Sequence, residues 1–198
     1  LGRDYQIVRP EFHQRRDTCL KARKARGDRL ERVLIAMGGT DPQGLTHSLL
    51  NVTAATLPDV AIDVISGSVS PELPRLRSAA ARLGPRVALH VDTPDVAELM
   101  CRADLGIGAG GTMTWERNML GLPSILLVVA DNQLHVGRVM ARERAALVID
   151  LRHGHDARTL TAHLSLFRNA PGDLAFLSER AAQLSGADGA RNMARILC

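Results

Sequence analysis

The stretch VLIAMGGTD at residues 33–41 is an apolar run that ends in two glycines, and LGIGAGGT at residues 105–112 repeats this pattern. Each stretch is followed by apolar residues at the three- and four-residue spacing of a helix. A strand that runs through glycines into a helix leaves backbone N–H groups unpaired, and the helix dipole adds about half a positive charge there. Both stretches therefore predict a phosphate-binding turn.

The chain alternates apolar runs with single helical patterns between residues 33 and 150. The six predicted strands span residues 33–37, 61–65, 87–91, 105–107, 124–129 and 146–150, and only helical patterns follow them. Single helices between strands predict an α/β fold with a doubly wound, Rossmann-like, six-stranded parallel sheet. In the commonest strand order, 3-2-1-4-5-6, the first and fourth strands are neighbours at the switch point where such folds bind ligands. Both glycine turns should meet there.

Composition and charge exclude several classes of protein. The 198 residues are 45% hydrophobic and only 3% aromatic, with three distant cysteines, so we expect an aliphatic core and no disulfide framework. No signal-peptide pattern or long apolar run occurs, which predicts a cytoplasmic protein without a membrane span. Eight Lys and Arg residues crowd residues 15–32 without interleaved aromatics. This favours a solvated helix face or linker over a nucleic-acid-binding arm.

The candidate site residues lie where predicted strands end or the following helices begin. Thr40 is as well suited to capping a helix as to binding phosphate, and Asn132 to capping as to binding sugar hydroxyls. Glu116, one turn into a helix, completes no capping box and is placed to accept the hydroxyls of a ribose. Four turn glycines, one threonine and one amide complete the candidate set: Gly38, Gly39, Gly110, Gly111, Thr112 and Gln133.

The residues supply no catalytic motif. The first turn lacks the full GxGxxG fingerprint, and no Ser-His-Asp order, Walker pattern or zinc spacing occurs. We therefore assign no metal, no cofactor and no catalytic residue to this chain. The residues alone predict a nucleotide-diphosphate site with a ribose-binding carboxylate.

A longer stretch carries a family resemblance. The sequence ADLGIGAGGTMTWER at residues 103–117, followed by GLPS at 121–124, resembles the UDP-2,4-diacetamido-2,4,6-trideoxy-β-L-altropyranose hydrolase of pseudaminic acid biosynthesis. Further similar motifs are RPEF at 9–12, GGTDP at 38–42, Asn132-Gln133, and Asp188-Gly189-Ala190-x-Asn192. The chain is more distantly similar to the C-terminal domain of the lipid II N-acetylglucosaminyltransferase and to other GT-B enzymes.

The resemblance implies the C-terminal, UDP-binding lobe of a two-lobed GT-B enzyme. Residues 1–32 would then be an interlobe linker with a basic lead-in segment, and residues 33–198 the UDP-sugar-binding domain. It implies that Glu116 binds the ribose and that backbone near Val91 meets the uracil. The catalytic base would belong to an N-terminal lobe absent from this chain, so this lobe alone is expected to be inactive.

Three functions remain open from the sequence. The first is a hydrolase that releases UDP and a free 2,4-diacetamido-trideoxyhexose by water attack at the anomeric carbon, for nonulosonic acid or surface polysaccharide biosynthesis. The second is the donor-binding domain of a GT-B UDP-sugar glycosyltransferase. The third is a non-enzymatic nucleotide-sugar-binding module. The expected partners are a UDP-sugar and the N-terminal lobe of the same protein.

Overall fold

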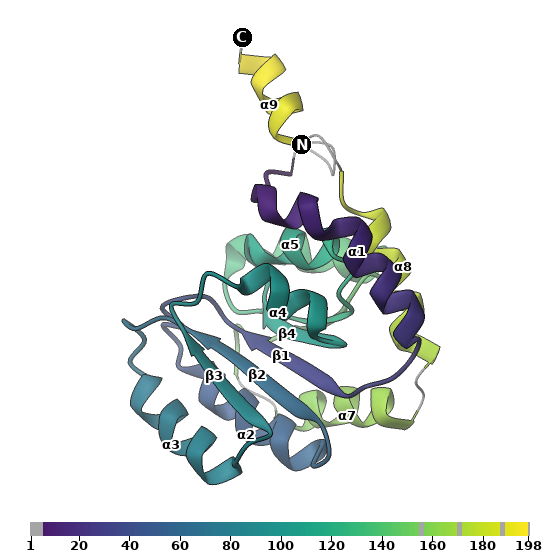
Figure 1. Ribbon diagram of the computed structural model, residues 1–198. Coiled ribbons are helices and arrows are strands. Elements are labelled where there is room, and N and C mark those ends of the chain that lie inside the picture. The colour runs from purple at the N-terminus through teal and green to yellow at the C-terminus, as the bar shows by residue number, and fades with distance from the viewer. Residues whose placement is uncertain (1–5, 155–156, 170–171, 187–188, 198) are drawn as a thin grey trace.

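The sheet is six-stranded and entirely parallel, with helices on both faces (Figure 1). The computed structural model describes residues 6–154, 157–169, 172–186 and 189–197. The strands are β1 (Arg32–Ala36), β2 (Ala61–Ser66), β3 (Val87–Val91), β4 (Leu105–Ala109), β5 (Ser124–Val128) and β6 (Leu147–Asp150). Their order is β3-β2-β1-β4-β5-β6. The predicted α/β class, strand positions and switch point between β1 and β4 are confirmed.

The helices divide between the two faces of the sheet. They are α1 (Pro10–Arg26), α2 (Leu45–Thr56), α3 (Leu73–Leu83), α4 (Val96–Arg102), α5 (Met113–Met119), α6 (Leu134–Arg142), α7 (Ala157–Asn169), α8 (Gly172–Gln183) and α9 (Gly189–Leu197), with a 3₁₀ turn at Asp131–Gln133. One face is covered by α2, α3 and α7, and the opposite face by α1, α4 and α5. Helix α6 and the end of α8 pack over Leu126 and Val128 of β5.

The aliphatic core follows the alternation of side chains along the strands. Val33 and Ile35 of β1 pack into the α2 and α7 layer, whereas Leu34 packs into the α1, α4 and α5 layer. All five residues of β5 are buried, as expected for a parallel strand covered on both faces. This core fixes the strand ends that carry the two glycine turns.

Helix α1 packs against the domain, although the sequence suggested a solvated face or linker for this region. Phe12 and Cys19 are buried beside α4 and α5. A disulfide joins Cys19 to Cys101 of α4, with their Cα atoms 5.2 Å apart, within the range such bonds span. The sequence did not indicate this pair, because residues 82 positions apart in sequence meet only once the helices have packed.

Two arginines of α1 bind the carboxyl ends of other helices. Arg23 is buried and donates hydrogen bonds to the carbonyl oxygens of Leu120, Ala103 and Met100, which end α5 and α4. Arg16 donates to the carbonyl oxygens of Met119 and Ala182. Helix ends leave carbonyls without partners, and cations are favoured there. Part of the basic stretch therefore has a structural role.

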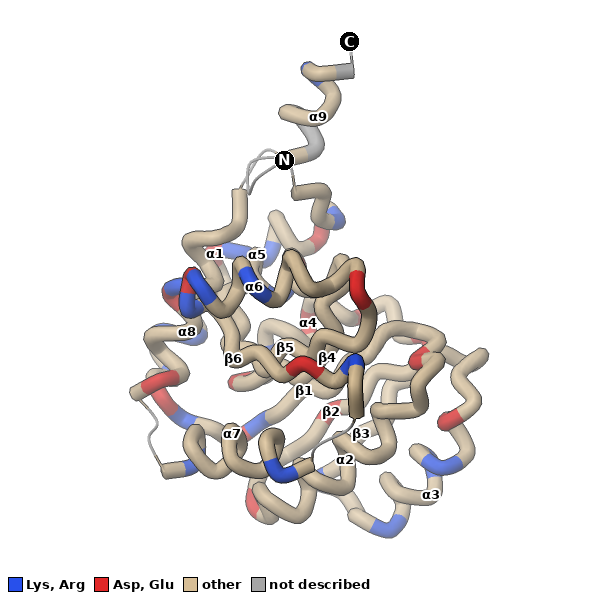
Figure 2. Tube along the Cα trace, turned by 180° about the vertical axis from the view of Figure 1, so that it is seen from behind, with Lys and Arg blue, Asp and Glu red and all other residues tan. Residues whose placement is uncertain are grey.

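The view from behind (Figure 2) shows Lys and Arg segments interspersed with Asp and Glu segments. Helix α9 projects away from the sheet and its covering helices in both views. Among the described residues, no helix is both long and apolar enough to cross a membrane. The side seen in Figure 2 carries charges of both signs.

Candidate functional site

The two glycine turns lie side by side at the carboxyl edge of the sheet. Strands β1 and β4 are hydrogen-bonded neighbours, and Ala36 of β1 is in register with Gly108 of β4. The residues that follow, 37–44 and 110–112, therefore leave the sheet at the same edge and next to each other. The structure brings together the two turns that the sequence predicts to meet.

The first turn is open at its tip. A Cβ atom added to Gly38 or Gly39 would meet nothing within 4 Å, and Gly38 has a φ of +98° that favours glycine. Gly67 donates its N–H to the carbonyl oxygen of Gly39, and a Cβ on Gly67 would lie 2.2 Å from that oxygen. The turn is thus held from β2 while its outer side, including exposed Thr40, stays accessible.

The start of α2 is capped by Asp41 rather than Thr40. The buried Asp41 carboxylate accepts hydrogen bonds from the backbone N–H groups of Leu45 at 3.2 Å and Thr46 at 2.8 Å. These two helix-start donors are therefore not available to an anion. The helix-capping role considered for Thr40 is wrong, because the next residue already binds these donors.

The second turn has one packed glycine and one open glycine. A Cβ atom on Gly110 would lie 3.2 Å from Cβ of Gln133, so this glycine allows β4 and the 3₁₀ turn to approach closely. A Cβ atom on Gly111 would meet nothing within 4 Å, and both Gly111 and Thr112 are exposed. No side chain of the described residues caps the start of α5. Gly111 and Thr112 can therefore be reached by a ligand.

Glu116 is buried one turn into α5, and its partner lies far away in sequence. Its side chain is 5% exposed, and Oε1 accepts a hydrogen bond from Nε of Arg9 at 2.8 Å. The hydrogen bond to Glu116 raises the pKa of Arg9, so the guanidinium is charged at neutral pH. Among the described residues, no hydrogen bond or ion pair to the other carboxylate oxygen, Oε2, is found. That oxygen is therefore an acceptor that a ligand hydroxyl can use.

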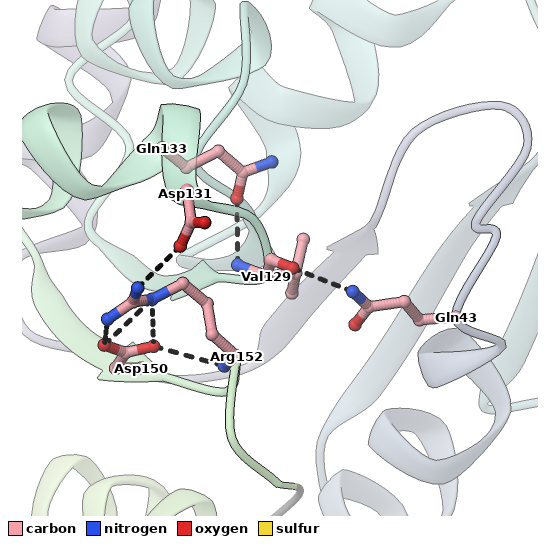
Figure 3. A network of polar contacts seen from close by, with 6 residues as sticks. All are labelled: Gln43, Val129, Asp131, Gln133, Asp150 and Arg152. Atoms are coloured by element: carbon pink, nitrogen blue, oxygen red, sulfur yellow. Dashed lines mark hydrogen bonds and ion pairs between the residues drawn. The ribbon is translucent and has the colours of Figure 1, made fainter.

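A third loop, after β5, is held by amide side chains (Figure 3). Nε2 of Gln43 donates to the carbonyl oxygen of Val129 at 2.8 Å, and the N–H of Val129 donates to Oε1 of Gln133 at 3.0 Å. Gln133 therefore ties this loop together through its oxygen. Asn132 is exposed, and its side chain caps no helix among those described.

Arg152 joins this loop to the end of β6. It binds Asp131 at 2.7 Å and Asp150 at 2.8 Å (Figure 3). Hydrogen bonds from Arg152 lower the pKa of Asp150 to about 2. The network keeps the β5 and β6 loops in one place at the carboxyl edge.

Val91 ends β3, the outermost strand on its side. It is half-buried and in register with Ser66 of β2. One strand, β2, lies between β3 and β1, and this places Val91 about 10 Å from the end of β1. It therefore shares the carboxyl edge with the glycine turns without adjoining them.

Three residues that hold the site together were not among the candidates predicted from the sequence. Arg9 pairs with Glu116, Gln43 holds the β5 loop, and Arg152 ties two loops together. The only sequence signal for Arg9 is that it begins the RPEF motif, and the only one for Gln43 is that it follows the GGTDP motif. Asp188, part of the last similar motif, lies outside the described residues.

In sequence, the chain is similar to a family of unknown function and to two longer proteins. The pattern of DUF354, described as a protein of unknown function, matches residues 73–151. The spore coat polysaccharide biosynthesis protein SpsG of Bacillus subtilis (strain 168) is 30% identical over 153 residues, covering 76% of this chain and 43% of SpsG. The uncharacterized protein MJ1062 of Methanocaldococcus jannaschii is 28% identical over 128 residues, covering 64% of this chain and 26% of the relative. The chain thus spans less than half the length of these curated relatives.

Solved structures share the fold at low identity. MurG of Acinetobacter baumannii superposes with a TM-score of 0.71 at 16% identity, over 89% of this chain and 52% of MurG. Anabaena HepE, solved with UDP and glucose, superposes with a TM-score of 0.63 at 16% identity, over 100% of this chain and 54% of HepE. The spinosyn rhamnosyltransferase SpnG, solved with thymidine diphosphate, superposes with a TM-score of 0.62 at 20% identity, over 83% of this chain and 45% of SpnG. The chain has a Rossmann-like α/β fold that matches about half of each of these three structures.

Proposed function

We propose that this chain binds the nucleoside diphosphate part of a UDP-sugar at the carboxyl edge of β1 and β4. The observation that carries this proposal is the pair of open glycine turns side by side, with a buried carboxylate one helical turn behind the second. Open backbone N–H groups suit phosphate, and a fixed carboxylate oxygen suits the hydroxyls of a ribose. Likeness to HepE, solved with UDP and glucose, supports the choice of nucleotide.

The proposed roles divide along the edge of the sheet. Backbone at Gly38, Gly39, Gly111 and Thr112 holds the diphosphate, and Thr40 adds a hydroxyl donor. Oε2 of Glu116 accepts from the ribose while Arg9 holds Oε1. Backbone dipoles aimed at the diphosphate would stabilise the negative charge that develops on it as the anomeric C–O bond breaks.

The remaining predicted residues serve the two ends of the ligand. Backbone near Val91 meets the uracil in this proposal, since the end of β3 lies on the same edge of the sheet as the two glycine turns. The exposed Asn132 lies on the sugar side. Gly110 and Gln133 also line the site in this proposal, where Gly110 packs against Cβ of Gln133 and Oε1 of Gln133 accepts the N–H of Val129.

We infer that the whole protein is an enzyme of polysaccharide biosynthesis, as SpsG is named. The finer hypothesis from the family resemblance is hydrolysis of a UDP-2,4-diacetamido-trideoxyhexose to UDP and free sugar. Transfer of the sugar to an acceptor is the second candidate, favoured by the fold shared with the rhamnosyltransferase SpnG. Both reactions would use the same UDP site together with an N-terminal lobe.

Calorimetric titration tests the nucleotide assignment. We expect saturable binding of UDP by the 198-residue chain, and no comparable binding of ADP or of free N-acetylglucosamine. Equal binding of ADP would contradict the uridine assignment, and no binding at millimolar UDP would contradict the site. Release of UDP by the protein with both lobes then separates the two reactions, because only a hydrolase releases UDP at full rate without an acceptor.

A further inference from the structure

Arg117 of α5 is completely buried, yet its guanidinium is only partly hydrogen-bonded. The residue is 2% exposed. Nη2 donates to the carbonyl oxygen of Ala109 at 3.0 Å and to Oγ1 of Thr114 at 3.2 Å. Nε and Nη1 have no hydrogen-bond partner among the described residues. Leaving buried donors unpaired is costly and rare, so these two require an explanation.

The guanidinium lies directly behind the second glycine turn. Ala109 is the last residue of β4, and the N–H of Thr114 donates to the carbonyl oxygen of Gly111. A Cβ atom on Gly108 would lie 2.6 Å from Nη1 of Arg117 and 2.4 Å from the carbonyl oxygen of Ala36. Gly108 is thus the position that lets the arginine reach the point where β1 and β4 end.

The positive charge of Arg117 is not neutralised by an ion pair. Among the described residues, no carboxylate lies within salt-bridge distance of it. The acidic group that acts on it is Glu116, whose carboxylate already binds Arg9. Burial lowers the pKa of Arg117 to about 10, so the group remains charged at neutral pH. A charge in such surroundings is screened less than one in water, so it acts more strongly on groups at the neighbouring glycine turn.

We propose that Arg117 is a positioning residue for the diphosphate of the ligand, and that the ligand's phosphates balance a buried charge that the chain leaves unpaired. This assignment rests on the proposed function of the site. Arg117 acts in two ways, by fixing the turn at residues 110–112 through Ala109 and Thr114, and by attracting negative charge to it. It does not touch the ligand.

The test compares the affinities for UDP and for uridine, which differ only in the diphosphate. We expect Arg117→Met, which removes the charge but keeps much of the volume, to weaken UDP binding about ten-fold and uridine binding less than about two-fold. Arg117→Lys keeps the charge and should hold UDP affinity within about three-fold of the wild type. If Arg117→Met does not fold, the affinities for UDP and uridine are compared in Arg117→Gln instead.

Arg23→Met is the matched control, because it removes a second buried arginine at the other end of α5. It should leave the ratio of UDP to uridine affinity unchanged. Equal losses for both ligands in Arg117→Met, or no loss for UDP, would overturn the assignment to Arg117 while leaving the UDP site intact. A wild-type chain that does not bind UDP would overturn the proposed function, and this assignment with it.

Discussion

Arg9 and Glu116 are 107 residues apart in sequence, yet Nε of Arg9 lies 2.8 Å from Oε1 of Glu116. The arginine side chain is 47% exposed and the glutamate side chain 5% exposed. Arg9 is itself held by Glu11 at 3.2 Å and by the ring of Phe12, whose centroid lies 4.8 Å from its guanidinium carbon. The segment before α1 therefore fixes the carboxylate on which the proposed ribose contact depends.

Glu116→Ala should weaken UDP binding about ten-fold or more, because a charged hydrogen-bond acceptor is lost. Calorimetry on the purified variant measures the effect. Glu98→Ala serves as the control, since Glu98 of α4 forms an exposed pair with Arg15 of α1. An unchanged affinity in Glu116→Ala would remove this residue from the site.

Gly39→Ala and Gly111→Ala should each weaken UDP binding about ten-fold while leaving thermal stability unchanged. A methyl group at either position meets nothing in the protein, so it can clash only with a bound ligand. Thermal unfolding and UDP titration of the same samples separate the two effects. Gly172→Ala, where the added Cβ is equally free, is the control. Normal UDP affinity in both turn variants would show that the ligand does not approach these turns.

Asp41→Ala should lower the free energy of unfolding by about 1–2 kcal/mol, because two N–H groups at the start of α2 lose their acceptor. Urea denaturation measures this loss. Thr40→Ala, the neighbouring exposed position, should leave stability unchanged. The opposite ranking of the two variants would mean that Thr40 caps the helix.

Arg23→Met should lower the free energy of unfolding by about 2–4 kcal/mol. Three carbonyl oxygens at the ends of α4 and α5 lose a charged donor in this variant, and all of them are buried with it. Lys24→Met changes the exposed neighbour on the same helix and should have little effect. Equal stability of the two variants would show that Arg23 does not hold these helices together.

The six strands and their order were predictable because buried parallel strands are continuous apolar runs and single crossovers are right-handed. The strand predicted at residues 33–37 lies one residue later than β1, and the strand predicted at residues 87–91 coincides with β3. The meeting of the glycine turns then follows from topology alone, with no knowledge of side-chain contacts.

The contacts that complete the site depend on packing between distant segments, and local patterns cannot reveal these. Nothing in the basic stretch distinguishes Arg23, which caps two helices, from Lys24, which is exposed. Asp41 and Thr40 are both good capping residues, and only the structure shows that the Asp41 carboxylate accepts the N–H groups at the start of α2. How residues 1–32 divide between linker and domain remains a prediction.

A titration of the ¹⁵N-labelled chain with UDP, followed through backbone amide signals, tests the central claim most directly. Binding at the carboxyl edge predicts that the amides of residues 38–40 and 110–112 and of Glu116 shift together and saturate with one affinity. Saturating shifts confined to the opposite edge of the sheet, near Arg23 and Asp104, or no saturable shifts at all, would contradict the account.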